Sequence, residues 1–257
     1  MDIVVVNYHT APDLGRFLDT LEQHPPSPPW TVTIVDVETS PRRDEDVAWA
    51  GGTLRVIGVA ENIGYGRACN LGATFGHEDV IALFNADVEI TAGSLDTCAH
   101  ALRQRDDWAI LGPCQVDTAN RIRHAGIFGT LACPKHRGWN EHGHGQHRDV
   151  RDDAVTVSGS AFFVKRKVWN ELTDCPLYQE VAPGAEGAFL PTPHYYEETW
   201  ASYHAQAHGY AVIYFGEVTM IHKWHRASKV GGWADQQMPV SRQMFRRACD
   251  GHGIPHD

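Results

Sequence analysis

The sequence has 257 residues, of which 42% are hydrophobic and 21% are charged, and its formal net charge is −10. This length and composition are typical of one substantial globular domain, and they exclude a disordered chain. The negative charge excludes a protein that wraps a nucleic-acid backbone, because such a protein needs a basic surface to displace counterions.

The sequence contains no stretch close to the roughly 20 apolar residues of a membrane span, so we expect no integral membrane association. Residues Met1 to Val6 form a short apolar run without a basic start, which predicts a first strand and not a signal peptide. The six cysteines are scattered, with no C-x-x-C pair. This pattern is typical of a reduced, cytoplasmic protein.

Through roughly the first 112 residues, apolar β-branched runs alternate with helical patterns. The predicted strands are residues 3–6, 31–36, 54–59, 80–84 and 108–111, and the predicted helices are about 12–21, 65–75 and 95–102. Strands that alternate with helices form parallel β-α-β crossovers. The prediction is therefore an α/β fold with an open, doubly wound, mainly parallel sheet.

The second half has a different character. Residues 115–153 are rich in Gly, His, Arg and Asp without clear periodicity, which indicates a long loop or a weak hairpin. The remaining predicted elements are a strand over 155–164 interrupted at Ser158-Gly159-Ser160, a helix starting near His194, a short strand over 211–215, and a polar tail after His222.

Polar residues follow four of the predicted strands, at the sheet edge where ligands bind in open α/β folds. They are Asn7-Tyr8, Asp36, Glu61-Asn62 and Asn85-Ala86-Asp87. A carboxylate at this edge suits a hard divalent cation that bridges two phosphates, so Asp87 is a candidate metal ligand. The alternative is that Asp87 only caps the helix that follows.

A glycine-containing segment, Gly64-Tyr65-Gly66-Arg67, opens the helix predicted after the third strand. Glycines at a strand-to-helix turn let backbone N–H groups approach an anion. The same segment, with Asp87 some twenty residues later, imitates a dinucleotide-binding fingerprint. Cys69 in the third glycine position, and a location after the third strand instead of the first, count against that alternative.

Two further clusters contain groups that can do chemistry. Glu197-Glu198 offers a carboxylate as general base for an attacking hydroxyl, although a solvated acidic pair in a first helical turn is the alternative. His222 can complete the coordination of a divalent ion such as Mn²⁺. Arg226 and Lys229 can hold a pyrophosphate, the first by forked hydrogen bonds and the second as a point charge.

Taken in order, these segments resemble glycosyltransferase family 2 of the GT-A fold, particularly its rhamnosyltransferase-like branch. The segments are Val5-Val6-Asn7-Tyr8, Val35-Asp36, Glu61 to Gly66 with Asn70, Asn85-Ala86-Asp87, Asp117 to Gly126, Ser158 to Ala161, Glu197-Glu198, Gly209-Tyr210 and His222. The resemblance covers residues 3 to about 222. It implies a GT-A nucleotide-sugar-binding fold with a smaller acceptor-side region. Residues 1–112 would be the donor-binding part, and 113–257 would be the acceptor-side and catalytic part of the same domain.

The resemblance also implies roles for individual residues. Asn85-Ala86-Asp87 stands where the family has a DXD-type motif, so Asp87 and His222 would bind Mn²⁺ or Mg²⁺. Glu198 would be the catalytic base, with Glu197 as the second choice. The residues that would contact the nucleotide-sugar are Asn7, Tyr8, Asp36, Asn62, Arg67, Asn70, Asn85, Ala86, Asp87, Gly159, Arg226 and Lys229.

Three positions depart from the family pattern. Asn85 replaces the first DXD carboxylate, Glu198 replaces an Asp, and Trp200 stands where the family often has another Asp, which predicts an unusual acceptor pocket. The expected activity is inverting transfer of a sugar from a UDP- or dTDP-sugar donor to a hydroxyl of a glycan, a lipid-linked saccharide or a protein. The alternatives are an NAD-type oxidoreductase and a non-catalytic module that binds a sugar-nucleotide or a glycan.

Overall fold

The computed structural model describes residues 1–130, 133–143, 145–224 and 233–256. The first half contains β1 (Asp2–Asn7), α1 (Ala11–Gln23), β2 (Thr31–Val37), β3 (Arg42–Arg43), β4 (Val47–Trp49), β5 (Gly52–Val59), α2 (Tyr65–Thr74), β6 (Val80–Asn85), β7 (Val88–Glu89), α3 (Ser94–Gln104) and β8 (Trp108–Val116). The five strands and three helices predicted from the apolar pattern are all present. β8 extends five residues beyond its predicted end, because its last residues remain buried.

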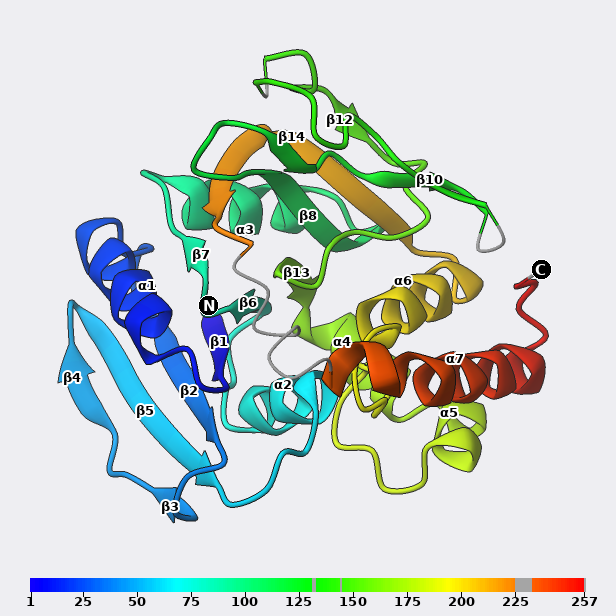
Figure 1. Ribbon diagram of the computed structural model, residues 1–257, viewed down its shortest axis with the longest axis horizontal. Coiled ribbons are helices and arrows are strands. Elements are labelled where there is room, and N and C mark those ends of the chain that lie inside the picture. The colour runs from blue at the N-terminus through cyan, green and yellow to red at the C-terminus, as the bar shows by residue number, and fades with distance from the viewer. Residues whose placement is uncertain (131–132, 144, 225–232, 257) are drawn as a thin grey trace.

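The second half contains β9 (Ile122–His124), β10 (Ile127–Gly129), β11 (Pro134–His136), β12 (Val150–Arg151), β13 (Ala161–Lys165), α4 (Arg166–Thr173), α5 (Pro176–Val181), α6 (Glu197–Ala207), β14 (Ala211–His222) and α7 (Trp233–His252). Figure 1 shows α5, α6 and α7 gathered on one side of the molecule, opposite β2, β4 and β5. Among the described residues, no helix is long and apolar enough to cross a membrane.

One large sheet runs through both halves, in the order β12-β14-β8-β13-β6-β1-β2-β5-β3. β5, β2, β1 and β6 are parallel neighbours, as expected for a doubly wound sheet. β13 lies between β6 and β8 and runs antiparallel to both. The division at residue 112 falls inside β8, so the predicted donor and acceptor parts share the same sheet.

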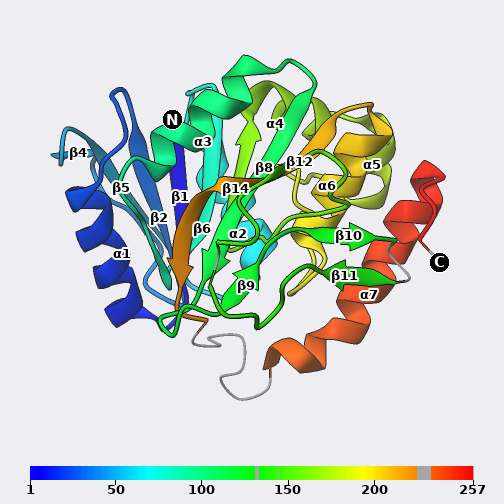
Figure 2. The ribbon, with the colours of Figure 1, turned by 90° about the horizontal axis from the view of Figure 1, so that it is seen from above.

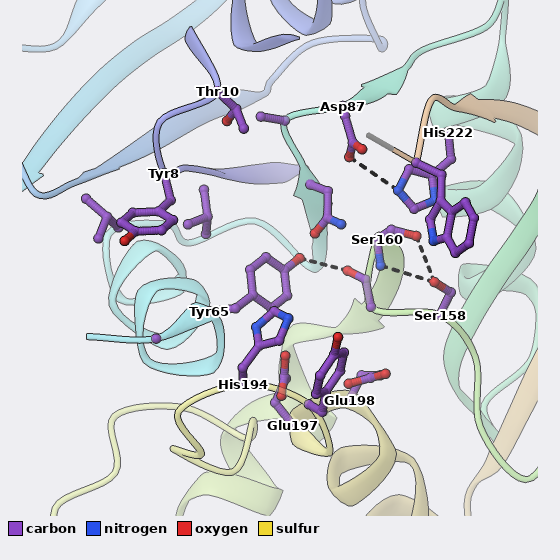
Figure 3. A pocket seen from close by; sticks show the side chains of 18 of the residues that line it. Tyr8, Thr10, Tyr65, Asp87, Ser158, Ser160, His194, Glu197, Glu198 and His222 are labelled. Atoms are coloured by element: carbon purple, nitrogen blue, oxygen red, sulfur yellow. Dashed lines mark hydrogen bonds and ion pairs between the residues drawn. The ribbon is translucent and has the colours of Figure 1, made fainter. Parts of the chain in front are cut away.

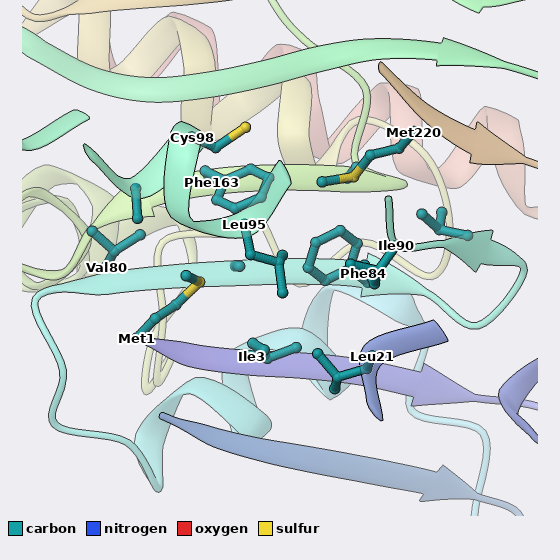
Figure 4. Packing of buried hydrophobic residues seen from close by; sticks show 14 of the residues in the cluster. Met1, Ile3, Leu21, Val80, Phe84, Ile90, Leu95, Cys98, Phe163 and Met220 are labelled. Atoms are coloured by element: carbon teal, nitrogen blue, oxygen red, sulfur yellow. The ribbon is translucent and has the colours of Figure 1, made fainter. Parts of the chain in front are cut away.

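Helices cover both faces of this sheet, and alternate residues of β1 show why. Ile3 and Val5 point into a core with α1 and α3, whereas Val4 and Val6 point into a second core with α2, α4 and α6. Figure 4 shows the first core, in which Phe84 and Phe163 pack around Leu95. Figure 2 shows the strands between α1 on one side and α7 on the other.

A glycine allows α2 to lie close to the central strands. A side chain at Gly72 would place its Cβ 2.4 Å from Val4 Cγ1 and 3.1 Å from Val35 Cγ2. Because real Cβ atoms do not approach that closely, any larger residue would push α2 away from β1 and β2. The close approach of α2 fixes the position of the Gly64 turn at the carboxyl edge of the sheet.

Three predictions for the second half, two for strands and one for the tail, were wrong in extent or type. The strand expected over residues 155–164 is only β13, and the short strand expected over 211–215 continues to His222 through a register shift between Phe215 and Thr219. The weak hairpin considered for residues 115–153 is present as the antiparallel pair β10–β11, and the same segment also contains β9 and β12. The expected polar tail contains α7, a 20-residue helix with Pro239 inside it.

Candidate functional site

The turn after β6 brings Asp87 beside His222. β7 pairs antiparallel with the end of β14, so that His222 lies opposite Val88. The Lys223 backbone N–H donates a hydrogen bond of 3.0 Å to the Asp87 carbonyl, which fixes the turn further. His222 Nε2 then lies 3.2 Å from Asp87 Oδ1, and both side chains are about one-tenth exposed.

The helix-capping alternative for Asp87 is wrong. α3 begins at Ser94, and its N-cap residue is Gly93, well downstream of Asp87. Asp87 instead points into the cavity at the carboxyl edge of β6, as Figure 3 shows.

One pocket collects side chains from distant parts of the chain. It has a volume of about 320 Å³, and Asp87, His222 and Glu198 all line it. The other lining residues are Val6, Tyr8, Thr10, Val37, Asn62, Gly64, Tyr65, Asn85, Ala86, Ser158, Gly159, Ser160, His194, Tyr195, Glu197 and Trp224. The sequence-based hypothesis required the metal candidates and the acidic pair to converge, and the structure places them around a single pocket.

The acidic pair occupies the first turn of α6, directly after Tyr195 and Tyr196, whose φ angles are 68° and 71°. A left-handed backbone is uncommon for residues other than glycine, and two such residues in succession turn the chain sharply into the helix. The pair is not solvated, contrary to the alternative considered above. Glu197 is only 4% exposed and Glu198 is half-buried, and both carboxyl groups line the pocket.

Burial shifts the proton affinity of this pair. Desolvation, together with the adjacent Glu198 charge, raises the pKa of Glu197 to about 8, and desolvation also raises the pKa of Glu198. Glu197 Oε2 also lies 3.2 Å from the Thr192 hydroxyl oxygen. Two carboxyl groups in one poorly solvated site cannot both ionise easily, so the pair retains a proton at neutral pH. Glu198, which is less buried, is the member better able to carry the negative charge.

The turn before β13 places two hydroxyl groups opposite the acidic pair. The Ser160 hydroxyl donates to Gln115 Oε1 at 2.6 Å, and the Ser158 and Ser160 oxygens lie 2.7 Å apart. The Tyr65 hydroxyl donates to the Gly159 carbonyl at 2.7 Å and ties α2 to this turn. A Cβ at Gly159 would lie 3.4 Å from Glu198, so a glycine here leaves room for that carboxylate.

Two of the predicted donor-binding residues lie behind the pocket wall. Asn7 Nδ2 donates to Asp36 Oδ1 at 2.8 Å, because β1 and β2 are in register at these residues. Asn7 Oδ1 accepts hydrogen bonds from the Thr10 backbone N–H and hydroxyl. Tyr8 lines the pocket itself, and so does Asn62. Asn7 and Asp36 therefore shape the turn that presents Tyr8.

Asn70 and Arg67, also predicted to contact the donor, do not line the pocket. Asn70 is 3% exposed, its Nδ2 donates to the Phe189 carbonyl at 2.8 Å, and its Oδ1 accepts from the Phe189 N–H at 3.2 Å. This side chain clamps α2 to residues 187–190, which corrects its predicted role. Arg67 is exposed on the first turn of α2. The other two predicted contacts, Arg226 and Lys229, lie outside the described residues.

The glycines at the start of α2 also serve packing. Gly64 has a φ of 81°, and a Cβ there would lie 2.5 Å from the Pro193 carbonyl oxygen. A Cβ at Gly66 would lie 2.8 Å from the Leu190 carbonyl oxygen and 3.1 Å from Glu197 Cβ. These glycines let the segment that carries the acidic pair approach α2. Cys69, in the third glycine position, is fully buried.

Sequence reasoning missed an aromatic group beside the pocket. Trp224 lines the pocket, and its ring is perpendicular to that of Trp139, with centroids 5.5 Å apart. The Arg123 guanidinium lies 4.6 Å from the Trp224 ring and 5.5 Å from the Trp139 ring, and it is paired with Asp117. Trp139 is 43% exposed. The two tryptophans are 85 positions apart in the sequence, so no local pattern could reveal this group.

Trp200 does not contribute to the pocket, which corrects the prediction drawn from its position. Its side chain is fully buried and stacks on Tyr178, with ring centroids 5.7 Å apart. It belongs to a separate core cluster between α5, α6 and α7.

Comparison with solved structures shows the same fold in several glycosyltransferases. A mannosyltransferase from Pyrobaculum calidifontis, solved with GDP-Man and Mn²⁺, has a TM-score of 0.59 and 14% identity over 97% of this chain. GalNAc-T7, solved with UDP, GalNAc and Mn²⁺, has a TM-score of 0.62 and 13% identity over 97% of the chain. S. aureus TarS 1–349 has a TM-score of 0.54 and 11% identity over 98%.

The chain spans 64% of the mannosyltransferase chain, 47% of the GalNAc-T7 chain and 71% of the TarS chain. At these identities the likeness establishes the GT-A fold alone. Among curated proteins, none matches the sequence.

The sequence profile of glycosyl transferase family 2 matches residues 2–172, about two thirds of the chain. The match covers the parallel strands β1, β2, β5 and β6, the Asn85-Ala86-Asp87 turn and the Ser158-Gly159-Ser160 turn. Glu197, Glu198 and His222 lie beyond it. With its GT-A fold and this match, the chain belongs to glycosyl transferase family 2.

Proposed function

We propose that this chain is an inverting, metal-dependent glycosyltransferase that uses a nucleotide-diphosphate sugar as donor and a hydroxyl group as acceptor. The observation that carries the proposal is one pocket with Asp87 and His222 on one wall and Glu197 and Glu198 on another. Family membership supports sugar transfer, and the two neighbours solved with Mn²⁺ support a metal. A UDP- or dTDP-sugar is the proposed donor, by resemblance to the rhamnosyltransferase-like branch.

The Asp87–His222 pair fits a divalent ion. Their ligand atoms lie 3.2 Å apart, close to the roughly 3 Å between adjacent ligands of a small octahedral ion. A carboxylate oxygen with an imidazole nitrogen suits Mn²⁺ better than Mg²⁺, because Mg²⁺ prefers oxygen alone. When bound, the ion would neutralise the negative charge that grows on the leaving diphosphate.

Glu198 is the proposed general base. It takes the proton of the acceptor hydroxyl while that oxygen forms a bond to the anomeric carbon. The bond from the anomeric carbon to the diphosphate oxygen breaks on the opposite face, so the configuration inverts and a nucleoside diphosphate leaves. Glu197, with its raised pKa, holds a proton and lowers the charge repulsion beside Glu198.

The aromatic group beside the pocket supports an acceptor that carries a sugar ring. The face of a pyranose is apolar enough to lie against an indole, and Trp139 is 43% exposed next to the pocket-lining Trp224. A glycan or a lipid-linked saccharide fits this surface better than a bare serine or threonine of a protein.

A thermal-shift panel tests the proposal. UDP-sugars, dTDP-sugars and NAD⁺ are added to the wild type with and without Mn²⁺, because a ligand stabilises in proportion to its occupancy. We expect Tm to rise with a nucleotide-sugar only when Mn²⁺ is present. Asp87→Ala should abolish that rise, whereas Asp106→Ala should not, because Asp106 is exposed at the opposite end of β8.

Three results would contradict the proposal. Equal stabilisation in Asp87→Ala would remove the metal assignment. Stabilisation by NAD⁺ without metal would favour the oxidoreductase. Donor binding without any donor hydrolysis or transfer, in the presence of saccharide acceptors, would leave a sugar-nucleotide-binding module.

A further inference from the structure

A second cluster of metal-ligating side chains lies away from the pocket, where α5, α6 and α7 meet. Cys175 precedes α5, His204 lies near the end of α6, and His252 ends α7. One ligand atom from each, the thiol sulfur or a ring nitrogen, lies within 4.8 Å of the other two. Cys175 Sγ and His252 Nε2 are 3.9 Å apart.

His204 makes this cluster chemically unusual. The residue is fully buried, and neither ring nitrogen has a hydrogen-bond partner among the described residues. Aromatic rings surround it, because Tyr178, Trp200, His208 and His252 all have ring centroids within 5.7 Å of the His204 ring. A buried polar group normally finds a partner, since leaving it unpaired destabilises the fold by about 1–3 kcal/mol. Ring packing alone leaves both nitrogens unpaired.

His252 is already oriented as a ligand. Its Nδ1 lies 2.8 Å from the Ala248 carbonyl and can only donate to it, so Nε2 carries the free lone pair. That lone pair is on the nitrogen nearest to Cys175. Histidines that bind metals usually donate their other ring N–H to a carbonyl or a carboxylate in this way.

We propose that Cys175, His204 and His252 bind a zinc ion, which joins α7 to α6. A thiolate with two imidazoles is a donor set that zinc favours over manganese or magnesium. Tetrahedral zinc places such ligands about 3.3–3.6 Å apart, so the largest separation here has to shorten by roughly 1 Å. Water completes the coordination on the side of His252, which is only partly buried.

The proposed zinc site differs from the Asp87–His222 pair in position and in donor type. A thiolate selects zinc, whereas the pocket offers a carboxylate and an imidazole. The zinc would act structurally, because it holds α7 against the helix that carries Glu197 and Glu198 at its other end. The inference therefore does not depend on the proposed transfer reaction, and the two can fail separately.

Metal analysis of the untagged full-length protein tests the inference. After dialysis, inductively coupled plasma mass spectrometry should find one tightly bound zinc per chain. Asp87→Ala should retain this zinc, whereas Cys175→Ala and His204→Ala should lose it. Cys249→Ala is the matched control, because Cys249 is a buried cysteine of the same core cluster but not one of the three ligands. Absence of zinc, or zinc retained in both ligand variants, would overturn the proposal.

A spectroscopic measurement on the wild type tests the same site without depending on whether the ligand variants fold. Zinc is removed with a chelator and replaced by Co²⁺, whose bond to a thiolate gives an intense near-ultraviolet charge-transfer band. We expect this band at one equivalent of Co²⁺. Zinc removal should also lower Tm by about 5–15 °C, with recovery on re-addition of zinc. A Co²⁺ protein without the thiolate band, or a Tm unaffected by the chelator, would rule the site out.

Discussion

The two ends of helix α6 carry buried polar groups in opposite surroundings. At the first turn, Glu197 and Glu198 face the pocket, with Gly159 and the hydroxyls of the neighbouring turn across from them. Near the last turn, His204 is closed in by the rings of α5, α6 and α7. Open volume beside a buried group leaves room for a reacting molecule. A closed cluster leaves room only for an ion or for packing.

Burial acts on both ends in the same sense, because it favours the neutral form of a titratable group. It raises the pKa of Glu197 to about 8 and lowers the pKa of His204 to about 3. The pocket end therefore holds two carboxyl groups whose pKa values are raised, and the closed end holds a neutral imidazole. We therefore expect chemistry at the first turn of α6 and structural anchoring at its last turn.

The variant with the largest expected effect is Glu198→Gln, which tests the pocket end of α6. This change removes the proposed base and keeps the shape of the side chain, so we expect kcat to fall by about 10²- to 10⁴-fold. Donor affinity and Tm should not fall, and Glu198→Asp should retain part of the activity. Steady-state transfer kinetics measure kcat, and titration with the donor measures donor affinity. Activity within threefold of wild type would move the base to Glu197, which Glu197→Gln then checks.

The closed end is tested by Trp200→Ala. Trp200 is fully buried, so its truncation should lower the free energy of unfolding by about 3–5 kcal/mol, measured by urea denaturation. At temperatures where the variant is folded, kcat should change by less than about tenfold. A variant of normal stability with greatly reduced kcat would contradict the expectation that the closed end of α6 serves the fold and not the reaction.

Glu197→Gln gives a pH-dependent gain in stability. Glu197 has a folded pKa near 8 and an unfolded pKa near 4.5, so its contribution to stability is present below pH 4.5 and is lost as pH rises towards 8. The glutamine variant avoids this loss, so relative to wild type its Tm should rise between pH 5 and pH 8. The corresponding difference in the free energy of unfolding between the variant and the wild type is on the order of a few kcal/mol. Glu217→Gln, at an exposed glutamate of β14, should give no such trend.

The smallest expected effect concerns the proposed acceptor surface. Trp139→Ala should raise KM for a saccharide acceptor about 3- to 10-fold and leave KM for the donor unchanged. Stability should change little, because the side chain is 43% exposed. Leu177→Ala, at an exposed apolar residue on α5, is the control and should alter neither KM. An equal rise in donor KM would place Trp139 on the donor side.

The parallel part of the fold was predictable because its signals are local. Buried strands such as β1 and β6 are unbroken apolar runs, and α1 shows a clear apolar stripe, so periodicity alone located them. β14 was predicted too short because the register shift after Phe215 interrupts its alternation. α7 was missed because its polar composition and Pro239 both count against a helix.

Within the site, sequence order and resemblance selected Asp87, Glu198 and His222, and the fold brings all three to one pocket. The wrong assignment of Asn70 has a physical reason. An asparagine near a ligand and an asparagine that clamps two chain segments look identical in sequence, and only the Phe189 contact distinguishes them. The roles of the three pocket residues stay predictions.

By itself, the sequence determined the alternation of strands and helices, the polar edge of the sheet and the family, because each depends on neighbouring residues or on the order of short motifs. Only the tertiary structure decided the 3.2 Å approach of Asp87 to His222, the pairing of Trp139 with Trp224, and the meeting of Cys175, His204 and His252. The residues in these contacts are separated by 29 positions (Cys175 and His204) to 135 positions (Asp87 and His222). Such pairings depend on how whole elements pack, and local composition carries no record of that.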